Sequence, residues 1–201
     1  MNIYEDKLES IAKFLKNATG TKVSIPQVRL SNKIHDIEEY RFENNKSYIV
    51  INPEIFEKYN QKTGQEISLD ALLAHSFFHH VQRILQIDYA KIARRLLLEE
   101  RGSSAFDRKF IGEASRNLVE SSAMLFALAY SMRGRNSKSQ VIKKLKQKAY
   151  LPHPGKLIKG NTLIIAYLKN HKINQALKVL VSQTPAKFRK NLKIRETKLA
   201  F

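Results

Sequence analysis

The chain has 201 residues, of which 43% are hydrophobic, and this is enough for one well-buried domain with or without a small helical annex. It contains no cysteine, which excludes disulfides, thiolate metal ligands and cysteine nucleophiles and leaves His, Asp and Glu to bind any metal. No apolar run approaches the roughly 18 residues of a membrane span, and the first residues do not resemble a signal peptide. We therefore expect a soluble cytoplasmic protein that does not insert into membranes.

The net charge of +18 is concentrated in the C-terminal half of the chain. Residues 1–100 contain 14 basic and 14 acidic residues, whereas residues 101–201 contain 22 basic and 4 acidic residues. This imbalance predicts an acidic partner, with nucleic acid the commonest kind. An anionic membrane, an acidic protein or a merely solvated basic surface are the alternatives. The candidate nucleic-acid contacts are Lys143, Lys144, Lys146, Lys148, Lys187, Arg189 and Lys190.

The N-terminal quarter of the chain predicts one helix followed by a small sheet. Apolar residues at helical spacing predict an amphipathic helix over residues 3–18. Val23 and Ile25 alternate with polar residues and predict a first strand. The segments 37–42 and 47–51 flank a polar turn, as the two strands of a hairpin do. We therefore expect a sheet of about three strands.

Beyond Pro53 the hydrophobic pattern is helical. Ser68 is a suitable N-cap for the helix that follows it, and Gly134 is a suitable terminator for a later helix. The predicted helices cover 54–60, 68–87, 88–100, 106–133, 137–149, 157–170 and 172–182, with 185–192 as an optional last helix.

The segment 151–155, Leu-Pro-His-Pro-Gly, forms a rigid break between two groups of predicted helices. It divides the chain into a domain over 1–150, which carries the sheet, and a basic helical subdomain and tail over 151–201. The predicted fold class is therefore α+β and mostly helical.

Two histidines four residues apart are the most informative feature of the sequence. His75 and His79 lie on one face of the predicted helix, so both imidazoles can reach a single metal ion. In the His-Glu-x-x-His pattern of zinc peptidases the second position is the general base, and here that position is Ser76. The alternative is a pair of structural histidines, each hydrogen-bonded to a neighbour. His80 is rotated by about 140° from His75 and is expected to contact a neighbouring segment instead.

A third ligand is predicted on the helix over 106–133. Glu120 lies in an otherwise apolar run and is suited to join the two histidines. Glu113 precedes it by seven residues, too far along the helix axis for both carboxylates to bind one ion. The simpler prediction for Glu113 is an ion pair with Arg116.

These motifs together resemble the gluzincin-type metallopeptidases. The chain is similar to that family in the strand and Asn-Pro turn over 48–54, in the His-Ser-Phe-Phe-His motif, in Glu120-Ser-Ser-Ala, and in the Gly-led helix over 159–168. The resemblance implies a zincin-like domain over 1–150 that holds zinc through His75, His79 and Glu120. It also implies that Tyr150 or His153 lies near the substrate oxyanion.

The missing base decides which function the sequence favours. A general base contributes ~10²–10⁴ in rate, and a serine hydroxyl at Ser76 cannot replace it near neutral pH. We expect a degenerate metallopeptidase homologue, inactive or weakly active, that acts as a binding protein and holds a structural zinc. One alternative is an active peptidase whose base is Glu113 or a substrate carboxylate. The other is a nucleic-acid-binding protein in which the histidines are structural.

Overall fold

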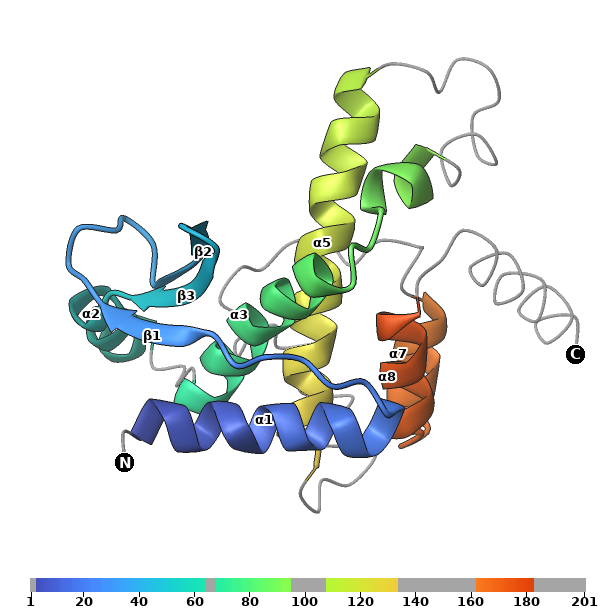
Figure 1. The fold of residues 1–201 in the computed structure, drawn as a ribbon, viewed down its shortest axis with the longest axis horizontal. Coiled ribbons are helices and arrows are strands. Elements are labelled where there is room, and N and C mark those ends of the chain that lie inside the picture. Colours follow the sequence, from blue (N-terminus) through green and yellow to red (C-terminus); the bar gives the residue numbers. More distant parts are fainter. Residues whose placement is uncertain (1–2, 64–67, 95–107, 134–161, 183–201) are drawn as a thin grey trace, which may run out of the picture.

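The computed structural model describes residues 3–63, 68–94, 108–133 and 162–182. The fold is mostly helical with one small three-stranded mixed sheet, in agreement with the predicted α+β class (Figure 1). Residues 89–94 are also helical. The labelled elements are α1 (Ile3–Thr19), β1 (Gln27–Leu30), β2 (Glu38–Glu43), β3 (Lys46–Ile51), α2 (Pro53–Thr63), α3 (Leu69–Ile84), α5 (Arg108–Ser131), α7 (Thr162–Lys169) and α8 (Ile173–Val181).

The N-terminal helix α1 is amphipathic, as its sequence predicted. Leu8, Ile11 and Leu15 recur at helical spacing and are fully buried against the core. The helix ends at Thr19 and is followed by Gly20, whose φ of 78° is a left-handed conformation that glycine adopts without a steric cost. Its backbone N–H donates to the carbonyl of Lys16 at 2.8 Å and so satisfies one of the last helical acceptors.

The sheet has the strand order β1-β3-β2. The hairpin of β2 and β3 is antiparallel and turns at Asn44 and Asn45, both with positive φ, as a two-residue hairpin turn requires. β1 pairs in parallel with β3, which is therefore the central strand. The hairpin and the number of strands were predicted correctly.

The position of the first strand was predicted wrongly. β1 begins at Gln27, after Pro26, whereas Val23 and Ile25 pair with no strand. A side chain takes up the backbone here instead, because Nε2 of His80 donates to the carbonyl of Ser24 at 2.9 Å.

The helices that follow the sheet begin at capping residues. Oδ1 of Asn52 accepts from the backbone N–H of Ile55 at 3.2 Å, and Pro53 occupies the first position of α2, where no N–H is needed. Oγ of Ser68 accepts from the N–H of Ala71, so the predicted N-cap of α3 is confirmed. α3 ends at Ile84 rather than at residue 87, because Gln86 takes a left-handed φ of 49°.

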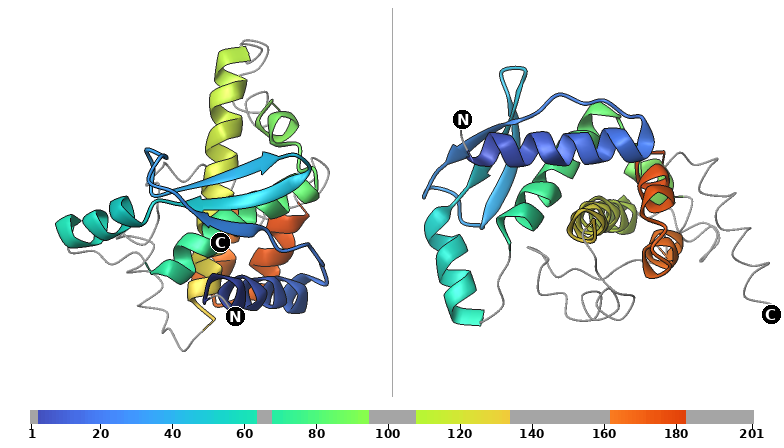
Figure 2. Two further views of the ribbon diagram at one scale, coloured as in Figure 1. Left: turned by 60° about the vertical axis from the view of Figure 1, so that its left-hand side comes forward. Right: turned by 90° about the horizontal axis from the view of Figure 1, so that it is seen from below.

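The core is built around α5, which is seen nearly end-on between α1, α3, α7 and α8 in the right-hand view of Figure 2. Phe126 of α5 lies at its centre, with its ring 4.8 Å from Phe78 and 6.3 Å from both Phe77 and Phe14 between centroids. The buried residues of α7 and α8 belong to the same hydrophobic cluster. The predicted packing role of Phe77 and Phe78 is confirmed, since both are fully buried.

A second, smaller hydrophobic cluster lies toward the N-terminal end of α5. Its buried members are Tyr89, Ile92, Ala93 and Leu118, so the helical residues 89–94 pack against α5 there. α5 therefore takes part in two clusters, one on each side of residue 120.

Several predicted features lie outside the described residues. They are the stop at Gly134, the break over 151–155, the helices over 137–149 and 185–192, Tyr150, His153 and the seven candidate nucleic-acid contacts. Within the described residues, none of the helices has both the length and the apolarity to cross a membrane.

We expect the substitution Phe126→Ala to destabilise the protein strongly, because the cavity would open where four helix-borne rings meet. The free energy of unfolding should fall by ~3–5 kcal/mol, the usual cost of removing a buried aromatic ring. Denaturant unfolding followed by circular dichroism measures this change. Phe42→Ala, at a ring that is 39% exposed, is the control and should cost much less. Equal losses in both variants would contradict the central place of Phe126.

Candidate metal centre

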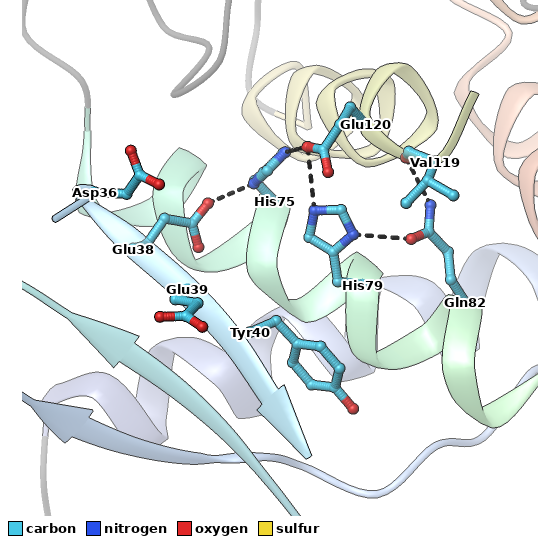
Figure 3. A pocket seen from close by; sticks show the side chains of 9 residues that line it. All are labelled: Asp36, Glu38, Glu39, Tyr40, His75, His79, Gln82, Val119 and Glu120. Carbon is cyan, nitrogen blue, oxygen red and sulfur yellow. Dashed lines mark hydrogen bonds and ion pairs between the residues drawn. The ribbon is translucent and has the colours of Figure 1, made fainter. Parts of the chain in front are cut away.

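Three side chains from two helices converge on one point. α3 presents His75 and His79 from consecutive turns, and α5 presents Glu120 across from them (Figure 3). Nε2 of His75 and Nε2 of His79 each lie 3.5 Å from the same Oε2 of Glu120. One ligand atom from each residue lies within 4.8 Å of the others, so this set can hold a metal ion. The structure thus brings together the three candidate ligands that the sequence singled out.

The orientation of His75 is set by a carboxylate from the sheet. Nδ1 of His75 donates to Oε1 of Glu38 on β2, and both side chains are almost completely buried. An imidazole that donates from Nδ1 turns its Nε2 toward the opposite side, here toward Glu120. Carboxylates play this part behind many metal-bound histidines, where they fix the ring and raise its basicity.

The orientation of His79 is set by an amide. Nδ1 of His79 donates to Oε1 of Gln82 at 2.9 Å, one turn further along α3. The amide nitrogen of Gln82 in turn donates to the carbonyl of Val119 at 2.8 Å and to the hydroxyl of Tyr89 at 3.2 Å. Gln82 is therefore fixed from three sides, and it holds His79 with Nε2 toward Glu120.

The electrostatics of the centre join His75 to two carboxylates. Burial alone would lower the pKa of His75, but Glu38 and Glu120 outweigh it and raise this pKa to about 9. Partial burial would raise the pKa of Glu120, but its contacts with His75 and His79 hold that pKa well below the ordinary range. At neutral pH His75 is thus protonated on both ring nitrogens when no metal is bound, and a metal ion that binds to Nε2 displaces the proton there.

The three candidate ligands line an open pocket of about 630 Å³. One wall comes from β2 and the residues just before it, and the other comes from α3 and α5 (Figure 3). A group bound between His75, His79 and Glu120 would therefore be open to a second molecule in the pocket. The lining residues are Asp36, Glu38, Glu39, Tyr40, His75, His79, Gln82, Val119 and Glu120.

Ser76 does not face this pocket. Its side chain is fully buried, it is absent from the lining, and its Oγ has no hydrogen-bond partner among the described residues. Glu113, considered above as a substitute base, is exposed on α5, lies outside the pocket lining and forms no ion pair with Arg116 in the described part of the chain. The predicted Glu113–Arg116 pair is therefore wrong, because the two side chains do not meet.

His80 has a separate structural role. Its Nε2 lies 2.9 Å from the carbonyl of Ser24, and its Nδ1 accepts from the hydroxyl of Tyr40 at 3.3 Å. Burial lowers the pKa of His80, which is consistent with a neutral ring that both donates and accepts. The prediction that His80 contacts a neighbouring segment is confirmed.

The sequence did not single out the residues that orient the two histidines. Glu38 is 37 residues away from His75, and nothing in the strand pattern marks it as inward-facing. Gln82 offered a weak signal, because it lies three residues after His79 and therefore on the same side of the helix. The acidic residues Asp36 and Glu39 were also passed over, although they border the pocket.

Comparison with known proteins yields no match, either to a family model, to a curated protein or to a solved structure.

We expect Glu38→Gln to weaken divalent metal binding by about tenfold to a hundredfold. The amide can still accept from Nδ1 of His75, but it removes the charge that makes the imidazole a better ligand. Isothermal titration with Zn²⁺ measures the affinity. Glu43→Gln, an exposed change of the same kind on the same strand, is the matched control and should leave it unchanged. Equal affinity in Glu38→Gln and the wild type would show that Glu38 does not support the site.

Proposed function

We propose that the protein is a zincin-like zinc-binding protein with little or no peptidase activity. The observation that carries this proposal is the arrangement of the two imidazoles. Both Nδ1 atoms are taken up by oxygen acceptors, and both Nε2 atoms approach one oxygen of Glu120. Histidines that have only a structural role need not point their free nitrogens at one place, whereas histidines that bind one ion must.

The donor set fits zinc, and so do the separations of Glu120 from the two imidazoles. Two ligand atoms at ~2.0–2.1 Å from a tetrahedral zinc ion lie about 3.4 Å from each other. The two separations of 3.5 Å between the imidazole nitrogens and Glu120 agree with that value. Two imidazoles and one carboxylate are also the ligands of several catalytic zinc sites, which leave the fourth position open. The pocket supplies that opening.

Zinc bound here would act as a Lewis acid and would lower the pKa of a bound water toward ~7. Peptide hydrolysis also needs a group that carries the proton from that water to the leaving amine. Ser76 is buried away from the pocket, and Glu38 is engaged with His75. These two observations support a site that binds without efficient hydrolysis.

The rival function is an active metallopeptidase that uses a base from the pocket wall. The observation in its favour is the presence of Asp36 and Glu39 among the lining residues. Neither belongs to the two ligand helices, so a base of this kind would act from the sheet side of the pocket. Nucleic-acid binding through the basic C-terminal half stays a prediction, since its candidate residues lie outside the described part of the chain.

The zinc site is tested by binding stoichiometry. We expect one Zn²⁺ to bind per chain. We expect His75→Ala and Glu120→Gln each to weaken the affinity for zinc by more than ~100-fold, which exceeds the usual effect of losing an orienting residue. Zinc at 100 times its dissociation constant should add about 2.7 kcal/mol to the free energy of unfolding, which thermal denaturation reports as a higher Tm.

Glu113→Gln is the matched control for Glu120→Gln. It makes the same change in charge on the same helix, at an exposed side chain outside the pocket. Its zinc affinity should equal that of the wild type. Zinc binding that survives in both His75→Ala and Glu120→Gln would overturn the proposed centre.

Peptidase activity provides the second test. The zinc-loaded wild type should cleave unstructured peptides at a negligible rate, because it lacks the general base that accelerates hydrolysis by a factor of ~10²–10⁴. Ser76→Glu restores the carboxylate of the motif at a position that is buried away from the pocket, and we therefore expect no gain in rate. Ser76→Gln, of similar size but unable to take a proton, is the control for packing at this buried position. A chelator-sensitive wild-type rate typical of zinc peptidases would instead establish the rival function.

A further inference from the structure

The pocket beside the candidate metal centre is acidic, although the chain as a whole carries a net charge of +18. Among the residues that the structure describes, nine line the pocket, of which four are carboxylates and none is lysine or arginine. The two positive charges of a divalent ion and two neutral imidazoles would leave two of the four carboxylate charges unbalanced. The pocket therefore attracts positively charged groups, whereas the chain as a whole attracts negatively charged ones.

The carboxylates of the pocket differ in what already balances them. Glu120 faces the two histidines and, on the proposed function, the metal. Glu39 pairs with Arg41 at 2.7 Å, on the exposed side of β2. Asp36 forms no ion pair with any residue that the structure describes. The uncompensated charge of the pocket therefore lies at the sheet wall rather than at the metal ligands.

Glu38 adds a second, independent feature to this wall. Its side chain is only 2% exposed, and while Oε1 accepts from His75, Oε2 has no hydrogen-bond donor among the described residues. Buried carboxylate oxygens are normally satisfied, because leaving one without a donor costs free energy. A cationic group in the pocket would stabilise this charge through the low-dielectric surroundings without a protein donor.

The acidic wall, by which we mean Asp36, Glu38 and Glu39, lies to one side of the metal ligands. In Figure 3 these three side chains gather at the start of β2, whereas His79 and Glu120 lie on the other side of His75. A ligand attached to the metal by one end would thus extend its other end along the acidic wall. A pocket of about 630 Å³ accommodates such a two-ended molecule.

We propose that this pocket binds ligands that combine a metal-binding group with a separate cationic group, such as an amine or a guanidinium. The metal-binding end takes the open position between His75, His79 and Glu120, and the cation lies against the acidic wall, closest to Asp36. This assignment rests on the proposed zinc site and adds the class of ligand that the site selects.

Three straight-chain hydroxamates of equal length test the proposal. Their free ends carry an ammonium, a methyl or a carboxylate group, while the hydroxamate that binds zinc is the same in all three. We expect the zinc-loaded protein to bind the ammonium compound about two- to fivefold more tightly than the methyl compound, and the carboxylate compound more weakly than either. The difference should shrink as salt is added.

Asp36→Asn should remove most of the preference for the ammonium end while leaving the affinity for zinc and for the methyl compound unchanged. Glu57→Gln, an exposed change of the same kind on α2 and outside the pocket, should leave the preference intact. Equal binding of all three compounds, or a preference that survives in Asp36→Asn, would overturn the proposal.

The zinc titration done beforehand separates this outcome from a failure of the proposed function. If zinc binds and the three hydroxamates are not distinguished, the metal centre stands and the ligand class is wrong. If the wild type binds no zinc, the proposed function is wrong and the ligand class falls with it.

Discussion

The packing of α3 against α5 is the contact on which the candidate centre depends. Phe77 and Phe78 face the core on one helix and Phe126 faces them from the other, so the two helices are held by stacked rings. This contact fixes the position of Glu120 along the α5 axis relative to the two histidines of α3. Ligands from separate helices stay within reach of one ion only if their backbones do not shift by more than a fraction of an ångström.

A layer of polar contacts surrounds the ligands and ties them to the rest of the fold. Glu38 connects His75 to the sheet, and Gln82 connects His79 to α5 and to the segment after α3. His75 is therefore fixed from the sheet, whereas His79 is fixed by a glutamine of its own helix that is anchored on α5. Buried histidines normally form such contacts, as His80 does, so the stronger support for a metal centre is that both Nε2 atoms approach the same oxygen of Glu120.

Local signals in the sequence accounted for much of the fold and for the ligand set. Helical spacing identified α1, the Ser68 cap located the start of α3, and the Asn-Asn turn identified the hairpin. Long-range contacts escaped prediction, since Glu38 meets His75 only once the sheet docks on α3. The first strand was misplaced for a similar reason. The backbone carbonyl of Ser24 is hydrogen-bonded to His80, 56 residues away, and such a contact cannot be read from the local sequence.

Glu120 lies at the boundary between the two hydrophobic clusters of α5, with Leu118 in the smaller one and Ala123 in the larger. Segments with separate cores can open separately, at free energies below that of global unfolding. An ion held by α3 and Glu120 would bridge that boundary, while Gln82 already reaches Tyr89 in the smaller cluster. The metal would then hold the two cooperative units together. Amide protons around residues 89–94 would exchange with solvent more slowly when the metal is bound.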